Sequence, residues 1–141
     1  MTVTFTVPGK PRGKGRPRFM RSGHTYTDQK TKDYERAIRV CYKLYHSEVF
    51  EGPVSVKITA LFPIPKSERK SSKAEMAAGH IRPKTKPDGD NIEKAVLDAL
   101  NGVAYGDDRQ VVSCTWEKWY GCDEQQVGLI VTISDEGRKN D

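Results

Sequence analysis

The feature that most constrains this chain is a predicted helix that begins at a pair of acidic residues. Asp88 and Asp90 are separated only by a glycine, and the helical pattern starts directly after them. Apolar residues then recur at spacings of three and four, which indicates one buried helix face (Ile92, Ala95, Val96, Ala99 and Leu100). The dipeptide Asn101-Gly102 is typical of a helix end. The chain must therefore bury one side of this helix and leave the other in solvent.

The exposed side of this helix is strongly charged. Asp90, Lys94 and Asp98 are spaced by four and fall opposite the apolar face, and Asp107 and Asp108 follow the helix end. Carboxylates that lie close together need a partner, and Mg²⁺ is usually held by one or two carboxylates together with phosphate oxygens of a substrate. We therefore expect an open metal site in which Asp107 or Asp108 folds back onto the acidic pair (Asp88 and Asp90) at the helix start.

A purely structural interpretation of the same acids is available. Asp90 with Glu93 three residues later fits a capping box, and Asp88-Gly89 after a proline fits an ordinary turn. A calcium-binding loop is excluded, because Ile92 and Glu93 occupy positions where that loop needs an oxygen ligand and a glycine. The two alternatives that remain are a metal site and a helix cap.

The charge distribution along the chain indicates a polyanionic partner. Residues 1–87 contain 19 Lys and Arg against 7 Asp and Glu, whereas residues 88–141 contain 5 against 12. A basic part attracts phosphates, while a separate acidic part can hold a metal ion that promotes their cleavage. The division therefore favours a nucleic acid as the partner.

Two segments concentrate the positive charge. Residues 8–21, the basic loop, contain six basic residues, no acid, three glycines and three prolines, so we predict an extended segment without regular structure that follows a phosphate backbone. Residues 66–82, the insertion, combine many Lys and Arg with a weak helical pattern over 67–79. Segments of this length are usually functional or mobile, and we predict a mobile basic arm beside the acidic site.

Apolar alternation predicts four strands, at residues 2–7, 54–62, 110–120 and 127–133. A helix is predicted from Thr27 or Asp28 to about Ser47, with one apolar stripe (Tyr34, Ala37, Ile38, Cys41, Leu44 and Tyr45). In the third strand Val112, Cys114 and Trp116 should share the core face, with Trp119 opposite. The expected fold class is α+β: one domain with a mixed four-stranded sheet packed by two or three helices.

The remaining composition sets simple bounds. A chain of 141 residues forms one domain, expected at 1–134 with a polar tail at 135–141. The three cysteines are odd in number and lack metal-ligand spacing, which is typical of reduced thiols in a cytoplasmic protein. No apolar run is long enough to span a membrane, and no signal peptide is apparent.

The motif from Lys86 to Val111 resembles that of the RusA-type Holliday junction resolvases of bacteria and their phages. It reads Lys-Pro-Asp-x-Asp-Asn-x-x-Lys-x-x-x-Asp-Ala-Leu-Asn-Gly, followed by Tyr-x-Asp-Asp-x-Gln-Val. Looser similarity extends over most of the chain, although the shortest members of the family lack the insertion. The resemblance implies a RusA-like fold and a magnesium-dependent endodeoxyribonuclease that resolves four-way junctions by paired symmetric nicks.

The resemblance also implies roles for particular residues. It makes Asp88, Asp90 and Asp108 the metal ligands and Lys94 an aid at the scissile phosphate, and it favours Asp108 over its neighbour Asp107. Asn91 and Asp98 are expected to support the structure. DNA contact is expected from the basic residues before the motif (Lys10, Arg12, Lys14, Arg16, Arg18, Lys84 and Lys86). The family acts as homodimers, and a two-fold symmetric substrate cut twice favours a homodimer as well. Leu97 and Trp119 are candidates for the dimer contact.

Two other functions remain open on the sequence. One is a non-catalytic DNA-binding protein whose acids cap a helix, and the other is a nuclease of the same fold that acts on forks, flaps or RNA. Magnesium-dependent nicking separates the first from the resolvase, and competition among a junction, a fork and a duplex separates the second.

Overall fold

A computed structural model describes residues 1–136 of the chain. Its main sheet has four strands, in the order β1 (Thr2–Pro8), β6 (Gly128–Asp135), β4 (Val54–Phe62) and β5 (Val111–Tyr120). β6 runs antiparallel to both of its neighbours, and β4 and β5 are parallel. The sheet is therefore mixed, and the predicted α+β class is confirmed. β6 includes Asp135, so the first residue of the expected tail belongs to the strand, and 137–141 lie outside the described residues.

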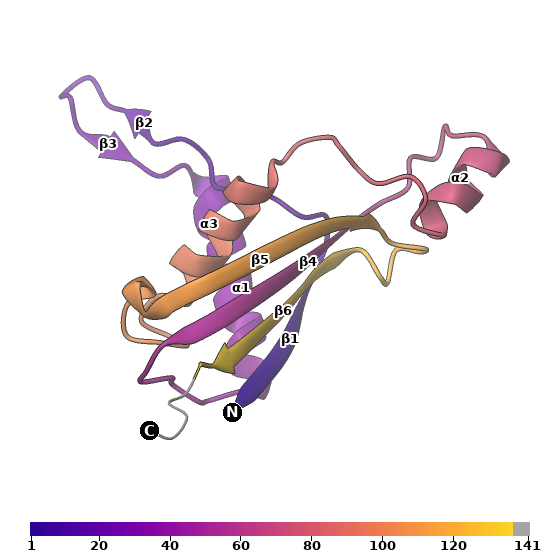
Figure 1. The fold of residues 1–141 in the computed structure, drawn as a ribbon. Helices are drawn as coiled ribbons and strands as arrows, with labels where there is room; N and C mark the ends of the chain where they lie inside the picture. Colours follow the sequence, from indigo (N-terminus) through magenta and orange to yellow (C-terminus); the bar gives the residue numbers. More distant parts are fainter. Residues whose placement is uncertain (137–141) are drawn as a thin grey trace.

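Two helices, α1 (Gln29–Tyr45) and α3 (Gly89–Leu100), cover one face of this sheet (Figure 1). The alternating residues of β4 that point towards them are at most 2% exposed (Val54, Val56, Ile58, Ala60 and Phe62). The five predicted apolar positions of α3 are at most 1% exposed (Ile92, Ala95, Val96, Ala99 and Leu100). The core is thus a single layer between these helices and the sheet, and its burial holds α3 in a fixed position. Among residues 1–136 no helix has both the length and the apolar composition that a membrane crossing requires.

α1 begins where the sequence predicts, because the Asp28 carboxylate accepts a hydrogen bond from the Thr31 N–H at 2.8 Å. Its buried stripe differs from the predicted one: Thr31, Tyr34, Ile38 and Tyr42 are buried. Leu44 and Tyr45 are 66% and 73% exposed, so neither lies in the core although both were predicted on the apolar stripe, and for Tyr45 the alternative of an interface residue stays open. The true stripe follows spacings of three, four and four, which turns the helix by about one residue relative to the expected face.

β5 also departs from the prediction, because it is an edge strand with a bulge. The register with β4 shifts after Val54, which leaves Val112 as an extra residue and 60% exposed instead of on the core face. Trp116 lies on the helix-covered side, opposite Ile58, yet it is 42% exposed because, within residues 1–136, β5 is the last strand on its side of the sheet. Trp119 falls on the other face, as predicted.

Two parts project from the sheet on either side of the start of α3 (Figure 1). One is a hairpin of β2 (Arg18–Phe19) and β3 (Thr25–Tyr26), formed by the end of the basic loop and the residues after it, where no regular structure was expected. The other is α2 (Lys70–Ala77), the predicted helix of the insertion. A short 3₁₀ helix, η1 (Asp108–Gln110), precedes β5.

Candidate active site

The acidic pair lies at the start of α3, and neither carboxylate forms a capping hydrogen bond with the helix backbone. Asp88 is the N-cap residue, but its carboxylate makes no capping hydrogen bond; only its backbone carbonyl accepts, from the N–H groups of Asn91 and Ile92. Asp90 lies in the first turn, so the capping box proposed for Asp90 and Glu93 is not formed, and that alternative was wrong. Both acids are exposed, and within residues 1–136 neither takes part in an ion pair. Their oxygens are thus available to a ligand, and helix N-termini favour such negative charge.

Lys94 lies one turn beyond Asp90 on the exposed side of α3. An ordinary helical ion pair with Asp90 or Asp98 would have been the simplest use of this lysine. Neither pair forms: Asp98 binds Lys14 at 3.0 Å instead, and in the described part of the chain Lys94 has no ion pair. The ammonium group of Lys94 is therefore free to meet an anion beside the acidic pair.

A glycine between the two acids allows Trp116 of β5 to pack directly on the helix start. A Cβ atom at Gly89 would lie 2.3 Å from three ring atoms of Trp116, far inside van der Waals contact. This contact of the indole ring with Gly89 thus fixes the position of β5 relative to the acidic pair. Sequence reasoning assigned Trp116 to the core, whereas its position places it under the candidate site.

The contact between Gly89 and Trp116 predicts that the effect of Gly89→Ala on the free energy of unfolding changes sign when Trp116 is replaced. Gly89→Ala should destabilise the protein, since the new methyl group displaces Trp116 or the helix start. In a Trp116→Ala background the clash is absent, and alanine in a helix is favoured over glycine by about 0.5–1 kcal/mol. Thermal unfolding of the four proteins tests this. Equal destabilisation in both backgrounds would contradict the packing described here.

Asp107 and Asp108, which the sequence could not separate, have different environments. Asp107 is the N-cap of η1: its carboxylate accepts from the Arg109 N–H at 2.9 Å, and Gln110 completes a capping box. The hydrogen bond from the backbone of Arg109 lowers the pKa of Asp107. Because Asp107 is occupied in local structure, Asp108 is the better candidate for a ligand, as the motif suggests.

One chain does not bring Asp108 to the acidic pair. In residues 1–136 no three His, Cys, Asp or Glu side chains gather closely enough to hold a metal ion. The turn after α3 stays at the helix C-terminus, where the Tyr105 hydroxyl donates to the carbonyl of Leu97 at 2.9 Å. The acidic pair lies near Trp116, which is five strand residues, or about 17 Å, beyond the start of β5. Within a single chain, Asp108 therefore does not fold back onto the acidic pair as the sequence predicted.

The basic loop is tied to the start of α3 by backbone and ionic contacts. Lys14 donates its N–H to the carbonyl of Asn91 at 3.0 Å, and its ammonium group binds Glu35 at 2.6 Å and Asp98 at 3.0 Å. Burial lowers the pKa of Lys14, but hydrogen bonds to these two carboxylates outweigh that effect and raise it. Lys14, predicted to bind DNA, thus joins the loop to α1 and α3. The Asp98 carboxylate supports this connection, as expected, whereas Asn91 contributes its backbone carbonyl.

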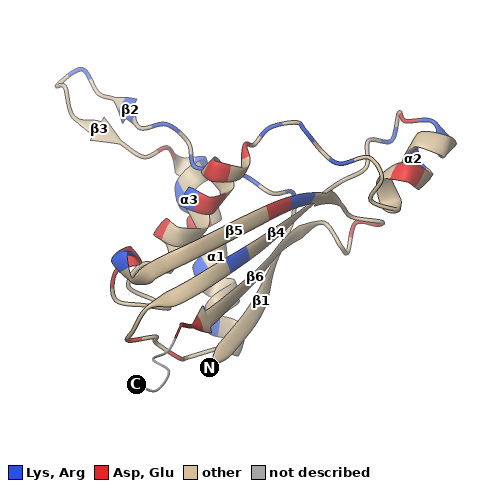
Figure 2. Cartoon of the chain, in the orientation of Figure 1, with Lys and Arg blue, Asp and Glu red and all other residues tan. Residues whose placement is uncertain are grey.

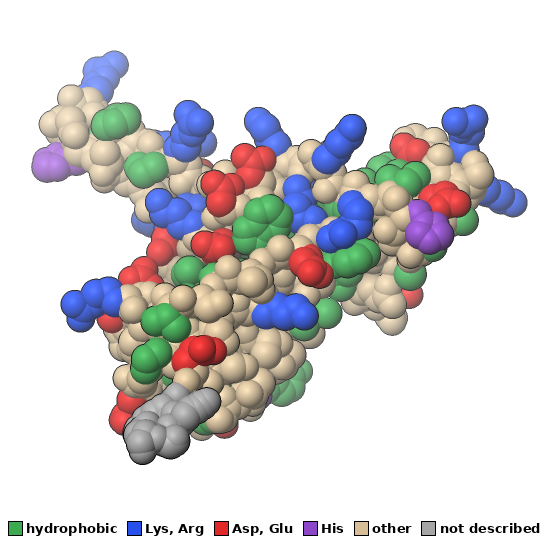
Figure 3. Space-filling view, viewed as in Figure 1, with side chains coloured by type: hydrophobic (Ala, Val, Ile, Leu, Met, Phe, Trp, Pro, Cys, Tyr) green, Lys and Arg blue, Asp and Glu red, His purple; other side chains and the backbone are tan. Residues whose placement is uncertain are grey.

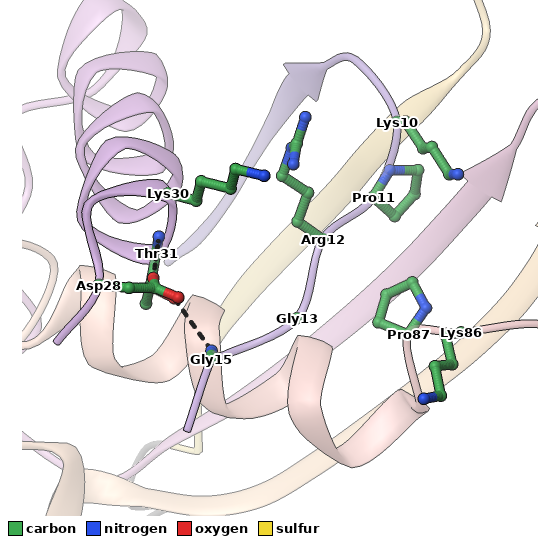
Figure 4. A pocket seen from close by; sticks show the side chains of 10 residues that line it. All are labelled: Lys10, Pro11, Arg12, Gly13, Gly15, Asp28, Lys30, Thr31, Lys86 and Pro87. Atoms are coloured by element: carbon green, nitrogen blue, oxygen red, sulfur yellow. Dashed lines mark hydrogen bonds between the residues drawn. The ribbon is translucent and has the colours of Figure 1, made fainter. Parts of the chain in front are cut away.

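An open groove of about 390 Å³ lies between part of the basic loop and the two residues that precede the acidic pair in the chain, Lys86 and Pro87 (Figure 4). Lys10, Arg12 and Lys86 line it, as does Lys30 from the first turn of α1, which sequence reasoning left out. The signal for Lys30 was its place in the first turn of the first helix after the loop. Figure 2 shows basic positions along the chain from the hairpin to α2, with acidic positions of α3 between them, and Figure 3 shows basic side chains along the same edge.

The insertion is docked onto β5 at its C-terminal end. The Arg82 guanidinium lies 3.5 Å from the ring centre of Trp119, and its Nε donates to the carbonyl of Lys118 at 2.8 Å. Lys118 in turn donates to the carbonyls of Thr85 and Pro87. These contacts hold the segment that carries the exposed Lys84 and Lys86 beside the groove. Trp119 thus packs on Arg82 and Leu97 packs against the core, and both side chains remain partly exposed.

A small α+β domain with two unpaired carboxylates inside a basic rim has the charge arrangement that suits a phosphate-rich polymer. The family model described as Endodeoxyribonuclease RusA matches residues 8–134, and the chain belongs to this family of DNA-cutting enzymes. The resemblance seen in the motif is confirmed. The uncharacterized protein YqaN of Bacillus subtilis (strain 168) is 38% identical over 135 residues, which cover 92% of this chain and 94% of the Bacillus protein.

Proposed function

We propose that this protein is a magnesium-dependent endodeoxyribonuclease that resolves four-way DNA junctions by paired symmetric nicks. The observation that carries the proposal is the acidic pair, which neither caps α3 nor pairs with a described cation while basic residues surround it. A non-catalytic DNA-binding protein has no need for exposed carboxylates that repel phosphate. Membership of the RusA family supports the nuclease and the DNA substrate.

The donor set at the start of α3 fits magnesium. Asp88 and Asp90 supply the hard oxygen ligands that this ion prefers, and two carboxylates with phosphate oxygens are its usual complement in proteins. When bound there, the ion supplies an activated water and stabilises the charge that develops on the phosphate. Lys94 would bind a non-bridging phosphate oxygen from one turn away, and Lys10, Arg12, Lys30 and Lys86 would hold the backbone on the groove side.

A second copy of the chain would supply the third carboxylate, Asp108, that the acidic pair lacks within its own chain. Since Asp108 lies away from the acidic pair of its own chain, we propose that it completes the site of a partner in a homodimer. Such a dimer has two equivalent sites, as two symmetric nicks require. An exposed apolar stripe on α1 (Val40, Leu44 and Tyr45) is a surface that a partner can bury.

The direct test is a cleavage assay with competing substrates. A labelled four-way junction should receive paired nicks in magnesium and none in the presence of a chelator. Fork, flap, duplex and RNA competitors, each in excess, should leave junction cleavage largely intact. If a fork or an RNA competes as well as the junction does, the protein is a nuclease of the same family with another substrate.

The basic loop offers a prediction with a matched control. Replacing Arg16 and Arg18 by Ala should weaken binding to all DNA and reduce the slope of log affinity against log salt by about two, since each phosphate contact contributes about 0.9. Lys14→Met should instead destabilise the fold by about 1–2 kcal/mol, because it leaves Glu35 and Asp98 without their cation. Salt titrations and thermal unfolding separate the two effects. An unchanged slope in the double variant would mean that the loop is only solvated.

A further inference from the structure

The hairpin of β2 and β3 stands apart from the core of the molecule. Arg18 pairs with Tyr26 and Phe19 with Thr25, and the turn is closed by hydrogen bonds from Met20 to His24 at 2.7 Å and from Gly23 to Met20 at 2.9 Å. Neither strand joins the main sheet, and Figure 1 shows the hairpin projecting beyond the start of α3. An isolated two-stranded hairpin is marginally stable in water, so its own ladder alone does not account for its order.

The hairpin exposes aromatic side chains on both of its faces. Phe19 is 77% exposed and Tyr26 is 45% exposed. Directly paired residues share a face and successive residues alternate, so Phe19 lies on the face opposite Arg18 and Tyr26. The described part of the chain leaves most of Phe19 and nearly half of Tyr26 uncovered. The hairpin therefore offers a partner an apolar, flat surface on each of its two faces.

The charge of the hairpin decides which partner fits. The first acidic residue of the chain is Asp28, and the preceding 27 residues contain six Lys and Arg. Gly15 and Asp28, which lie just before and just after the hairpin in the chain, line the basic groove (Figure 4). Aromatic rings interleaved with arginines are typical of surfaces that stack on nucleobases and neutralise phosphates. DNA bases fit this surface better than an apolar groove of another protein does.

The hairpin is anchored close to the acidic pair. The Gly15 N–H donates to the Thr31 hydroxyl at 3.0 Å, and the preceding residue, Lys14, is bound to α1 and α3 by its ion pairs. From Gly15 to Phe19 the chain can span at most about 13 Å, which is the rise of about four base pairs. Bases stacked on the hairpin would thus lie within a few base pairs of a phosphate held at the acidic pair.

We propose that the hairpin is a wedge that places Phe19 and Tyr26 against the base pairs flanking a DNA branch point. A continuous duplex has no exposed base-pair faces, whereas an opened four-way junction has them on more than one side of its centre. The aromatic rings on the two faces of the hairpin match these exposed base-pair faces, and apolar wedges are known to enter opened base steps. The hairpin then provides selectivity for branched DNA, and this inference rests on the proposed function.

The test uses full-length Asp90→Asn protein, which should bind without cutting, and junctions carrying 2-aminopurine beside the branch point. Binding should change the fluorescence of this base. Phe19→Ala should remove most of the change and reduce the preference for junction over duplex about tenfold, whereas Phe19→Trp should retain both. Val49→Ala, an exposed apolar residue before β4, is the matched control and should have no effect.

The possible outcomes are distinguishable. If Phe19→Ala keeps the junction preference and the fluorescence change, the wedge is wrong, although the nuclease assignment stands. If Phe19→Ala instead converts a dimer to a monomer in sedimentation, the hairpin binds a second copy and the inference also fails. If the Asp90→Asn protein binds no branched DNA, the proposed function fails first. Thermal unfolding of Phe19→Ala should match that of the parent, because the ring lies outside the core.

Discussion

Replacing Asp90 with Asn is expected to reduce cleavage of a four-way junction by about 10³-fold or more, because the metal-dependent charge stabilisation that it supports is worth several kcal/mol. Binding of the junction should persist or become tighter, since the amide keeps the shape of the side chain and removes one charge that repels phosphate. Gel-shift and cleavage assays on the same preparation measure both quantities. The same result is expected for Asp88→Asn.

The control for this prediction must exclude unfolding. Asp90 does not cap α3 and has no ion pair in residues 1–136, so Asp90→Asn should leave the free energy of unfolding within about 0.5 kcal/mol of the parent. Glu51→Gln changes an exposed acid in the loop before β4 and should cut normally. Near-normal cleavage by Asp90→Asn would remove the metal assignment, whereas loss of cleavage together with unfolding would return the acids to a structural role.

Elements with strong periodicity were predictable from the sequence. β1, β4 and α3 each bury one regular set of side chains, and in each the period decides the element without knowledge of its neighbours. α1 was located correctly but rotated, because apolar residues lie on two adjacent arcs of the helix and tertiary packing buries only one. The exposed arc, with Leu44 and Tyr45, carries no local signal of its exposure.

The candidate site was predictable only in part, for a similar reason. The acidic pair and Lys94 lie on one short segment, so their proximity follows from helix geometry. The position of Asp108 depends on a turn that is long enough to reach either end of α3. Hydrogen bonds from Val103 and Ala104 to the carbonyl of Leu100 keep this turn at the helix C-terminus, and no spacing rule could reveal them.

The shared site that we propose leads to a large effect in a mixing experiment. Asp90→Asn and Asp108→Asn should each be inactive as homodimers. In their heterodimer, one site receives both defects and the other receives none, so junction nicking should return. With random association of the two copies, about half of the dimers would carry one intact site. Because only one site works in each, the products should be single nicks instead of paired ones.

A matched mixture makes the result decisive. Asp90→Asn mixed with Asp88→Asn places one defect in each site of the heterodimer, so no activity should return although the subunits exchange equally well. Two different affinity tags allow the heterodimer to be isolated and its formation verified before the assay. If the isolated heterodimer of Asp90→Asn and Asp108→Asn remains inactive, Asp108 does not act on its partner. Since one chain leaves Asp108 apart from the acidic pair, the metal site would then rest on Asp88 and Asp90 with ligands from the DNA.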